Sequence, residues 1–364
     1  MTIIEGLEGF RTLRPGSVMS IGNFDGIHRG HRSLLAMAEG LRSPRGMGVP
    51  PMSAAPDPGA AQLDPVFIRS CAAYMGGTPM PQGETPMPLV VVTFEPHPLT
   101  VLRPEAVPPR LTPLAVKRAI LEAAGVDTLV LLPPSRDLLD LSAEQFWQLL
   151  VSEVRPAHLI EGESFTFGKG RGGTLEKLRQ WAVGSGIELH VAQSVHAVLL
   201  NLSVVSVSSS LIRWLISQGR VRDAAICLGR PYALEGIVVK GNQRGRTIGT
   251  PTANLDVTDQ LVPADGVYAG RAVVDQISYR AAVSIGTLPT FDGATRQVEA
   301  HLLDFTAGDL YGRGLCVELT DWLRDQRKFS GVDALKVQIA DDLIQVGRRA
   351  ALDPSREIGV ETLA

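Results

Sequence analysis

The chain has 364 residues, of which 45% are apolar and 20% charged, with a formal net charge of −3. This length suggests two domains, each with a core of its own, because single domains usually hold about 100–200 residues. The slightly acidic balance and the low aromatic share of 5% argue against a general nucleic-acid-binding protein. Such a protein needs a basic face or an aromatic stacking platform.

The cysteines, the first residues and one uncharged stretch bear on the cellular compartment of the protein. Cys71, Cys227 and Cys316 lie far apart and match neither a metal-binding nor a redox spacing, as expected of isolated thiols in a reducing cytosol. Residues 1–11 carry acidic side chains and lack the apolar core of a signal peptide. Residues 191–212 lack Asp, Glu, Lys and Arg, but their six serines make them too polar for a membrane span. We expect a soluble, cytoplasmic protein without a membrane partner.

The first two hundred residues alternate short, β-branched apolar runs with segments whose apolar residues recur at helical spacing. The expected strands cover residues 17–21, 89–94, 128–132, 158–160 and 188–192. The expected helices cover residues 31–41, 113–124, 143–154 and 175–183. This alternation predicts a doubly wound α/β domain with a parallel sheet. Ligands bind such sheets at the carboxyl ends of the strands, where functional residues are expected.

One segment interrupts this pattern. Residues 44–88 are crowded with Pro and Gly and hold five of the eight methionines. Such a stretch is typical of a surface insertion or a disordered excursion from a compact domain. Only residues 65–74 have the pattern of a turn or two of helix, and we assign the insertion no function.

The second half of the chain has a different pattern of expected elements. Two short helices are expected at residues 208–218 and 221–228, and after them the chain becomes strand-and-turn. The expected strands cover residues 233–239, 266–274, 279–285, 297–304 and 315–322. Strands without intervening helices predict an antiparallel barrel or sandwich. Residues 331–346 predict a closing amphipathic helix with Leu335, Ile339 and Leu343 on one face, followed by a loose tail.

A loop rich in glycine and histidine follows the first expected strand. It opens with Gly22, Asn23 and Phe24, and glycines there let backbone amides approach a phosphate at a helix N-terminus. His28 and His31 are three residues apart, so they project to one side of the first helical turn and can stabilise charge on a phosphorus. Two surface histidines capping a helix, or half of a zinc site, are the alternatives, although no further zinc ligands are obvious.

The run His-Arg-Gly-His in this loop is similar to the signature of the nucleotidyltransferase superfamily. The second half of that signature is a Ser/Thr-rich turn followed by Ile-Arg, and residues 208–213, Ser-Ser-Ser-Leu-Ile-Arg, have this form. Hydroxyls of Ser208 and Ser209 then hold phosphate oxygens, and Arg213 takes the β- and γ-phosphates of the leaving pyrophosphate. An ordinary helix N-cap is the alternative for the serines.

A second glycine-rich run, also basic, covers residues 241–254. It is not a P-loop, because the Gly-Lys-Ser/Thr ending is missing and no helix follows. A flexible hairpin explains its glycines but not its ending, Pro-Thr-Ala-Asn. The oxygens of Thr252 and Asn254 point the same way along a strand and suit Mg²⁺. The candidate nucleotide-binding residues of this run are Gly241, Arg244, Gly245, Arg246 and Gly249.

Glu299 is the candidate general base. It lies in an alternating segment that predicts a strand, with Glu299 and His301 on one face and the apolar residues on the other. A carboxylate that faces an ATP–Mg²⁺ site can accept a hydroxyl proton during phosphoryl transfer. A solvated acidic residue on a strand is the alternative.

These motifs, in this order, resemble the bacterial bifunctional riboflavin kinase/FMN adenylyltransferase family, the FAD synthetases. The resemblance covers nearly the whole chain apart from the insertion and the tail. Besides the motifs above, it rests on residues 92–98, 111–113 with Lys117, 162–170, 228–232, 265–270, 285–286, 289–291 and 327–329. It implies a Rossmann-like α/β nucleotidyltransferase domain, followed by a six-stranded antiparallel β-barrel of the riboflavin kinase type with a closing helix.

The resemblance also implies two ATP-dependent reactions, riboflavin to FMN in the barrel and FMN to FAD in the α/β domain. His28 and His31 stabilise the transition state of adenylyl transfer, whereas Thr252 and Asn254 hold Mg²⁺ and Glu299 acts as base in the kinase. In addition, Ser164 contacts the adenylyltransferase substrate, and a mobile segment that closes over the flavin contains Arg327 and Phe329.

The implied domains are an adenylyltransferase at residues 1–207, a helical connector at 208–230, a kinase at 231–348 and a tail at 349–364. The family pattern usually has Asp or Asn at Ser164, an aromatic residue at Thr250 and an arginine at Leu288. The nearest alternative is a riboflavin kinase with a degenerate adenylyltransferase domain. A flavin-binding regulator without turnover, and an adenylyltransferase with another phosphorylated acceptor, are more distant alternatives.

Overall fold

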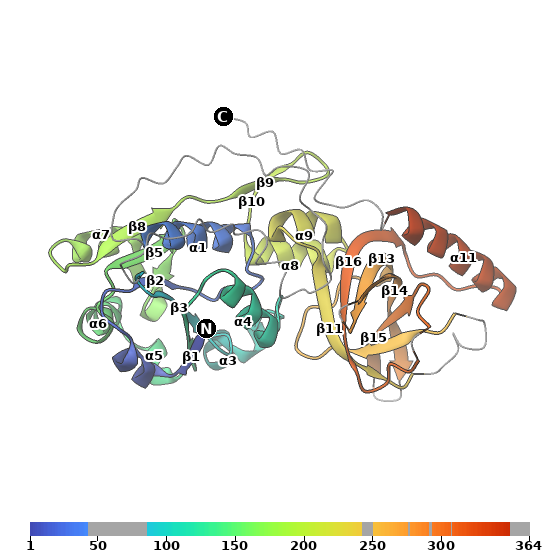
Figure 1. Ribbon diagram of the computed structural model, residues 1–364, viewed down its shortest axis with the longest axis horizontal. Helices are drawn as coiled ribbons and strands as arrows, with labels where there is room; N and C mark the ends of the chain where they lie inside the picture. The colour runs from blue at the N-terminus through green and yellow to red at the C-terminus, as the bar shows by residue number, and fades with distance from the viewer. Residues whose placement is uncertain (43–85, 242–249, 276, 291–292, 307, 350–364) are drawn as a thin grey trace. The chain divides into compact units, whose positions relative to one another are not determined.

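The computed structural model describes residues 1–42, 86–241 and 250–349, except 276, 291, 292 and 307 (Figure 1). Most of the insertion, most of the run at 241–254 and the tail lie outside these residues. The described chain forms two compact units. The first unit contains residues 1–42, 86–108 and 114–196, and the second contains 109–113 and the described parts of 197–349.

The first unit is built on a six-stranded parallel sheet with the order β1-β4-β3-β2-β5-β8. The strands are β1 (Thr2–Glu5), β2 (Val18–Ile21), β3 (Leu89–Phe94), β4 (Thr128–Leu132), β5 (His158–Gly162) and β8 (Glu188–Ala192). The sequence patterns predict all of them except β1, an edge strand of four residues paired with β4. The histidine-bearing loop therefore follows the second strand of the chain, not the first.

Helices cover both faces of this sheet, which confirms the doubly wound arrangement. α1 (Arg29–Leu41) and α4 (Leu114–Ala123) share one apolar core with inward residues of the strands. α6 (Ala143–Leu149), continued by a short π-helical segment (Leu150–Val154), and α7 (Leu175–Ala182) share the core on the other face. α3 (Leu99–Leu102) and α5 (Arg136–Leu139) are single turns in the connections. The strand order reverses between β2 and β5, which is where such folds bind ligands.

The second unit contains a closed barrel with the order β11-β12-β15-β14-β13-β16, all pairs antiparallel. The strands are β11 (Tyr232–Val239), β12 (Ala253–Asp256), β13 (Gly266–Val274), β14 (Ile277–Thr290), β15 (Gly293–Leu302) and β16 (Gly314–Arg324). β11 pairs with both β12 and β16, so the sheet closes on itself and the sandwich alternative is excluded. The six-stranded barrel implied by the resemblance is confirmed.

Helices precede and follow the barrel. A two-stranded hairpin, β9 (His196–Val198) and β10 (Val204–Ser206), leads into α8 (Ser209–Ser217) and α9 (Val221–Leu228). The expected closing helix is α11 (Val332–Arg349), which packs against β13, β14 and β16. Leu335, Ile339 and Leu343 are partly buried, as its amphipathic pattern predicts.

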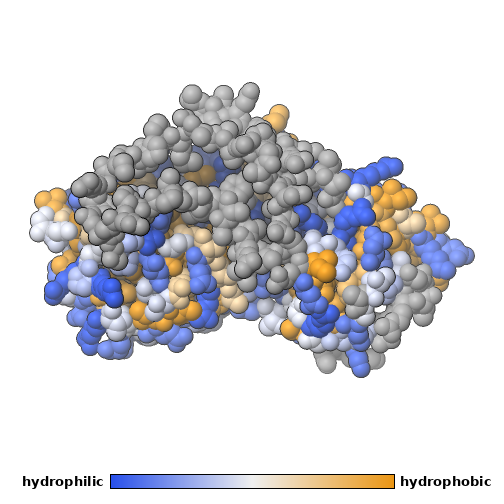
Figure 2. All heavy atoms as spheres, in the orientation of Figure 1, coloured by the Kyte–Doolittle hydropathy of each residue, from blue (hydrophilic) through white to orange (hydrophobic). Residues whose placement is uncertain are grey.

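The described surface mixes polar and apolar side chains (Figure 2). Apolar side chains are exposed on the outward face of α11, namely Val332, Val337 and Ile344. Within the described residues, no helix combines the length and the apolar character that a membrane crossing requires.

Candidate active sites

The loop between β2 and α1 is tightly folded against the sheet. Gly22 donates its N–H to the carbonyl of Val92 at 2.9 Å. Phe24 and Ile27 have φ angles of 46° and 38°, in the left-handed region that L residues rarely occupy, and both side chains are buried in the core beneath α1. Such backbone strain persists only where surrounding packing imposes it, and it concentrates at functional sites.

His28 and His31 lie against each other at the start of α1. Their ring centroids are 3.8 Å apart with an interplanar angle of 21°, and the ring of Phe24 lies 5.0 Å from that of His31. His28 is the N-cap of the helix and only 7% exposed. The prediction from their spacing, that both rings project to one side, is confirmed. Two imidazoles beside a helix N-terminus can donate hydrogen bonds to a phosphate.

A buried lysine holds this loop in place. The Lys117 ammonium on α4 donates to the carbonyl of Asn23 at 3.1 Å, and the Thr93 hydroxyl donates to the same oxygen at 3.0 Å. Lys117 also forms an ion pair with Glu95 at 3.6 Å, and the Asn23 amide lies 3.3 Å from a ring nitrogen of His97. A fixed positive charge therefore lies beside the loop at the carboxyl end of the sheet.

Glu161 is a functional candidate that the sequence analysis misses. It lies on β5, is 1% exposed, and its Oε1 accepts the N–H of Ile21 at 2.9 Å. β2 and β5 are paired in register only at Val18 and Met19, so the carboxyl of Glu161 bridges the two strands where their ladder ends. Burial raises its pKa well above the usual range, and the hydrogen bond from Ile21 lowers it by less. An acidic residue inside the apolar run His-Leu-Ile-Glu-Gly is the signal that could have revealed it.

Glu161→Gln is expected to gain stability over the wild type as the pH rises from about 5 to 8. The carboxyl has a raised pKa in the folded chain, so its stabilising contribution is present below the unfolded pKa of about 4.3 and is lost as the pH rises toward the folded pKa. Glutamine stays neutral and keeps an oxygen for the Ile21 N–H. The difference in the free energy of unfolding between the variant and the wild type should therefore move in favour of the variant as the pH rises.

Urea unfolding at several pH values measures this difference. Glu163→Gln is the matched control, because Glu163 is exposed and hydrogen bonds from Ser194 lower its pKa. The Glu163 carboxylate stabilises the fold at high pH, and this stabilisation is lost as the pH falls. Glu163→Gln should therefore not gain stability over the wild type as the pH rises. A difference between Glu161→Gln and the wild type that stays constant from pH 5 to 8 would contradict the protonated form of Glu161.

The remaining predicted residues of the adenylyltransferase lie in the turn after β5 and at the start of α8. Ser164 is exposed in the turn after β5, where Phe165 donates its N–H to the carbonyl of Gly162. The hydroxyl of Ser208 accepts the N–H of Leu211 at 3.2 Å, so it caps α8 in the way that the alternative for these serines anticipates. Ser209 begins this helix. Arg213 donates from Nε to the carbonyl of Pro109 at 2.8 Å, within the second unit.

The barrel aligns three polar residues across neighbouring strands. Asn254 on β12 stands opposite Glu299 on β15, and Glu299 stands opposite Ser284 on β14. Opposite residues of antiparallel strands present their side chains on the same face. The flanking residues Val298 and Ala300 are buried in the barrel, so the aligned residues belong to its outer face. We call Asn254, Glu299 and Ser284 the polar row.

The amide of Asn254 has an oxygen that is not satisfied by the described residues. Its Oδ1 is buried and has no hydrogen-bond partner among the described residues. A Cβ added to Gly241 would lie 2.3 Å from its Nδ2, so a side chain at this position would displace the amide. His301 places a ring nitrogen 2.7 Å from the carbonyl of Pro251, beside the partly buried Thr252. An unpaired amide oxygen and a hydroxyl are hard oxygen donors, so these residues fit Mg²⁺.

Part of the predicted nucleotide loop is not described. Arg244, Gly245, Arg246 and Gly249 lie outside the described residues, and so does the side chain of Leu288. Their expected roles therefore stay predictions.

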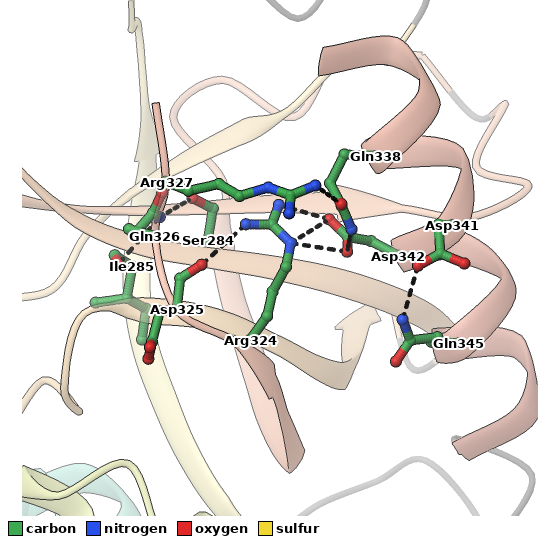
Figure 3. A network of polar contacts seen from close by, with 10 residues as sticks. All are labelled: Ser284, Ile285, Arg324, Asp325, Gln326, Arg327, Gln338, Asp341, Asp342 and Gln345. Atoms are coloured by element: carbon green, nitrogen blue, oxygen red, sulfur yellow. Dashed lines mark hydrogen bonds and ion pairs between the residues drawn. The ribbon is translucent and has the colours of Figure 1, made fainter. Parts of the chain in front are cut away.

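The segment after β16 connects the polar row to α11 (Figure 3). Gln326 donates to the hydroxyl of Ser284 at 2.8 Å, and Arg327 donates to Gln338 of α11. Arg324 forms a bidentate ion pair with Asp342 of α11, with distances of 2.7 and 2.9 Å. The guanidinium of Arg327 lies 5.1 Å from the ring of Phe329. The predicted closing segment is thus anchored at both Arg324 and Gln326.

Asp342→Ala is expected to lower the free energy of unfolding by about 3–5 kcal/mol, because it leaves the mostly buried Arg324 without its carboxylate. Urea unfolding measures the loss. Asp341→Ala is the control, since Asp341 is exposed and bonds only to Gln345 among the contacts drawn in Figure 3. Equal losses in the two variants would show that the ion pair does not anchor α11.

Comparison with known proteins assigns both units. Residues 228–349 match the family model described as riboflavin kinase, and residues 11–59 and 81–208 match the one described as FAD synthetase. The bifunctional riboflavin kinase/FMN adenylyltransferase of Escherichia coli K12 is 33% identical over 346 residues, 94% of this chain and 96% of that protein. The protein of the same name from Pseudomonas fluorescens is 33% identical over 357 residues, 98% and 99% of the two chains.

A solved structure described as a macrolide-efflux protein from Streptococcus pneumoniae has the same fold. It superposes with a TM-score of 0.75 at 28% identity, covering 95% of this chain and 99% of that one. The likeness extends over both units, so the combination of a parallel-sheet domain and a barrel is shared. The name belongs to that protein, and only the fold is carried over.

Proposed function

The chain belongs to the bifunctional riboflavin kinase/FMN adenylyltransferase family, and from this premise we propose how its own residues carry the two reactions. It is an enzyme of FAD biosynthesis, which phosphorylates riboflavin to FMN and adenylylates FMN to FAD, with ATP consumed in each step. Both halves match, so the alternative of a kinase alone is rejected. We assign adenylyl transfer to residues 1–207 with the connector at 208–230, and the kinase to residues 231–348.

In adenylyl transfer, an oxygen of the FMN phosphate attacks the α-phosphorus of ATP, and the bond to pyrophosphate breaks. The stacked pair His28 and His31 is the observation that supports this site. The imidazoles donate to oxygens of the α-phosphate, on which charge accumulates in the transition state. Lys117 holds the loop and adds a positive charge. We assign the oxygens of the leaving pyrophosphate to Arg213, with Ser208 and Ser209 at the start of α8.

In the kinase, Glu299 accepts the proton of the ribityl 5′-hydroxyl as that oxygen attacks the γ-phosphorus of ATP and ADP leaves. The register that places Asn254 opposite Glu299 is the observation that supports this assignment. We propose that Asn254 and Thr252 hold Mg²⁺, which supplies charge neutralisation for the phosphate oxygens. The base and the oxygens that orient ATP thus come from adjacent strands.

The segment from Asp325 to Phe329 is the proposed cover of the flavin. Its contact with Ser284 brings it to the polar row, and its anchor on α11 limits how far it can open. The aromatic ring of Phe329, flanked by the guanidinium of Arg327, offers a flat surface against which an isoalloxazine can stack.

A time course with riboflavin and Mg-ATP tests the whole assignment, with the flavins separated by chromatography. We expect FMN to rise first and then to give way to FAD. If FMN accumulates and no FAD forms, even when FMN and fresh ATP are supplied, adenylyl transfer by this chain is disproved. Ser164, where the family pattern usually has Asp or Asn, is then the first residue to replace by Asp. If riboflavin is not consumed, the kinase assignment fails.

A further inference from the structure

A second cluster of chemically active side chains lies away from both sites, on strands β5 and β8. His158 is the first residue of β5, and Glu188 and His190 are the first and third residues of β8. His158 is paired with Glu188, and Ile160 with His190, so the three side chains lie on one face of the sheet. It is the face that carries Ile160 and α1. The carboxyl ends of the strands, where the loop of His28 lies, are at the other end.

The three potential ligand atoms converge on one point. The Nδ1 of His158 lies 3.1 Å from the Nε2 of His190 and 3.4 Å from the Oε2 of Glu188. The third separation, from the Nε2 of His190 to the Oε2 of Glu188, is 3.7 Å. Ligands of a tetrahedral zinc ion at about 2.0–2.1 Å are about 3.3–3.4 Å from one another. The observed separations lie on both sides of this value.

The surroundings also suit a metal. Both rings are largely covered, whereas the Glu188 side chain is 71% exposed, so that an ion can enter from solvent. Two imidazoles with one carboxylate suit zinc rather than Mg²⁺, which prefers oxygen ligands alone.

We propose that His158, Glu188 and His190 form a zinc site that ties the edge strand β8 to β5, with water in the fourth position. No part of either reaction needs this ion, and its place near the amino ends of the strands gives it a structural role. The competing explanation is a hydrogen-bonded network in which the two rings and the carboxylate share protons without a metal.

Zinc titration of the full chain, first stripped by a chelator, distinguishes the two explanations. The probes are Zn²⁺ by calorimetry and Co²⁺ by its visible absorption, which is intense for tetrahedral sites. We expect one ion per chain, and a melting temperature that rises with zinc. His190→Ala and Glu188→Gln should each weaken zinc binding about 100-fold or more.

Two controls locate the binding. His196→Ala removes an exposed histidine of the neighbouring hairpin and should bind zinc as the wild type does. His28→Ala should also retain zinc, because the proposed site does not involve the catalytic loop. Circular dichroism of each metal-free variant reports whether it is folded. Absence of zinc binding by the folded wild type, or loss of binding in His28→Ala but not in His190→Ala, would overturn the proposal.

Discussion

Glu299→Gln is expected to lower the rate of FMN formation by about 10²–10⁴-fold, while ATP binding stays nearly intact. The carboxylate is the only group of the polar row that can take up the proton of the ribityl hydroxyl. Glutamine has the same shape and leaves the β12–β15 pairing undisturbed, so the loss reports on the base itself. Initial rates with riboflavin and Mg-ATP, followed by chromatography of the flavins, measure it.

Two comparisons separate this effect from damage to the fold. We assign FAD formation from supplied FMN to the loop of His28 and not to the polar row, so its rate should remain at the wild-type value. Glu235→Gln makes the same substitution at a partly buried carboxyl on β11, outside the polar row, and should leave FMN formation unchanged. If Glu299→Gln keeps most of the wild-type rate, Glu299 is not the base.

His28→Ala is expected to lower FAD formation from supplied FMN by about 10²–10³-fold, without slowing FMN formation. The substitution removes a ring that stacks on His31 at the start of α1. In the proposed mechanism this ring donates to the phosphate in the transition state. Because the interaction strengthens as charge develops, kcat should fall more than KM rises. Pyrophosphate release from FMN and ATP measures the rate.

His28→Asn provides the matched comparison, because its amide can donate a hydrogen bond from a similar position. We expect it to recover part of the rate lost in His28→Ala. The kinase rate of both variants shows whether the chain is folded. Equal loss of both activities would instead indicate a folding defect or coupling between the sites.

The sequence predicts the buried strands well because their signal is local. β3, β4 and β8 begin and end at the expected residues. Strands covered on both faces need apolar residues at nearly every position, and such runs are conspicuous. β1 has only four residues at the edge of the sheet, and it becomes a strand by pairing with β4. Its β-branched run Thr-Ile-Ile is too short to distinguish a strand by itself.

The candidate sites also combine features that follow from local spacing with features that depend on the tertiary structure. The shared side of His28 and His31 follows from helical spacing, and the shared face of Glu299 and His301 follows from the alternation of a strand. That Asn254 stands opposite Glu299 depends on the register between β12 and β15, which lie far apart in the chain. The contact of Gln326 with Ser284 depends on where the chain turns after β16. The sequence prediction groups Asn254 and Glu299 in one site, but it contains neither this strand pairing nor the contact of Gln326 with Ser284.

The order of residues along the chain specifies which chemical groups are present: a glycine-rich loop with two histidines, oxygen donors of the kind that suit Mg²⁺, and one carboxylate on a strand. Folding determines which of these groups meet, closes the strands into a barrel, and buries Glu161 at the switch point between β2 and β5. Local patterns report the period and polarity of a segment. The desolvation of a carboxyl and the register of distant strands depend on the packing of the whole unit, and they arise only when it has folded.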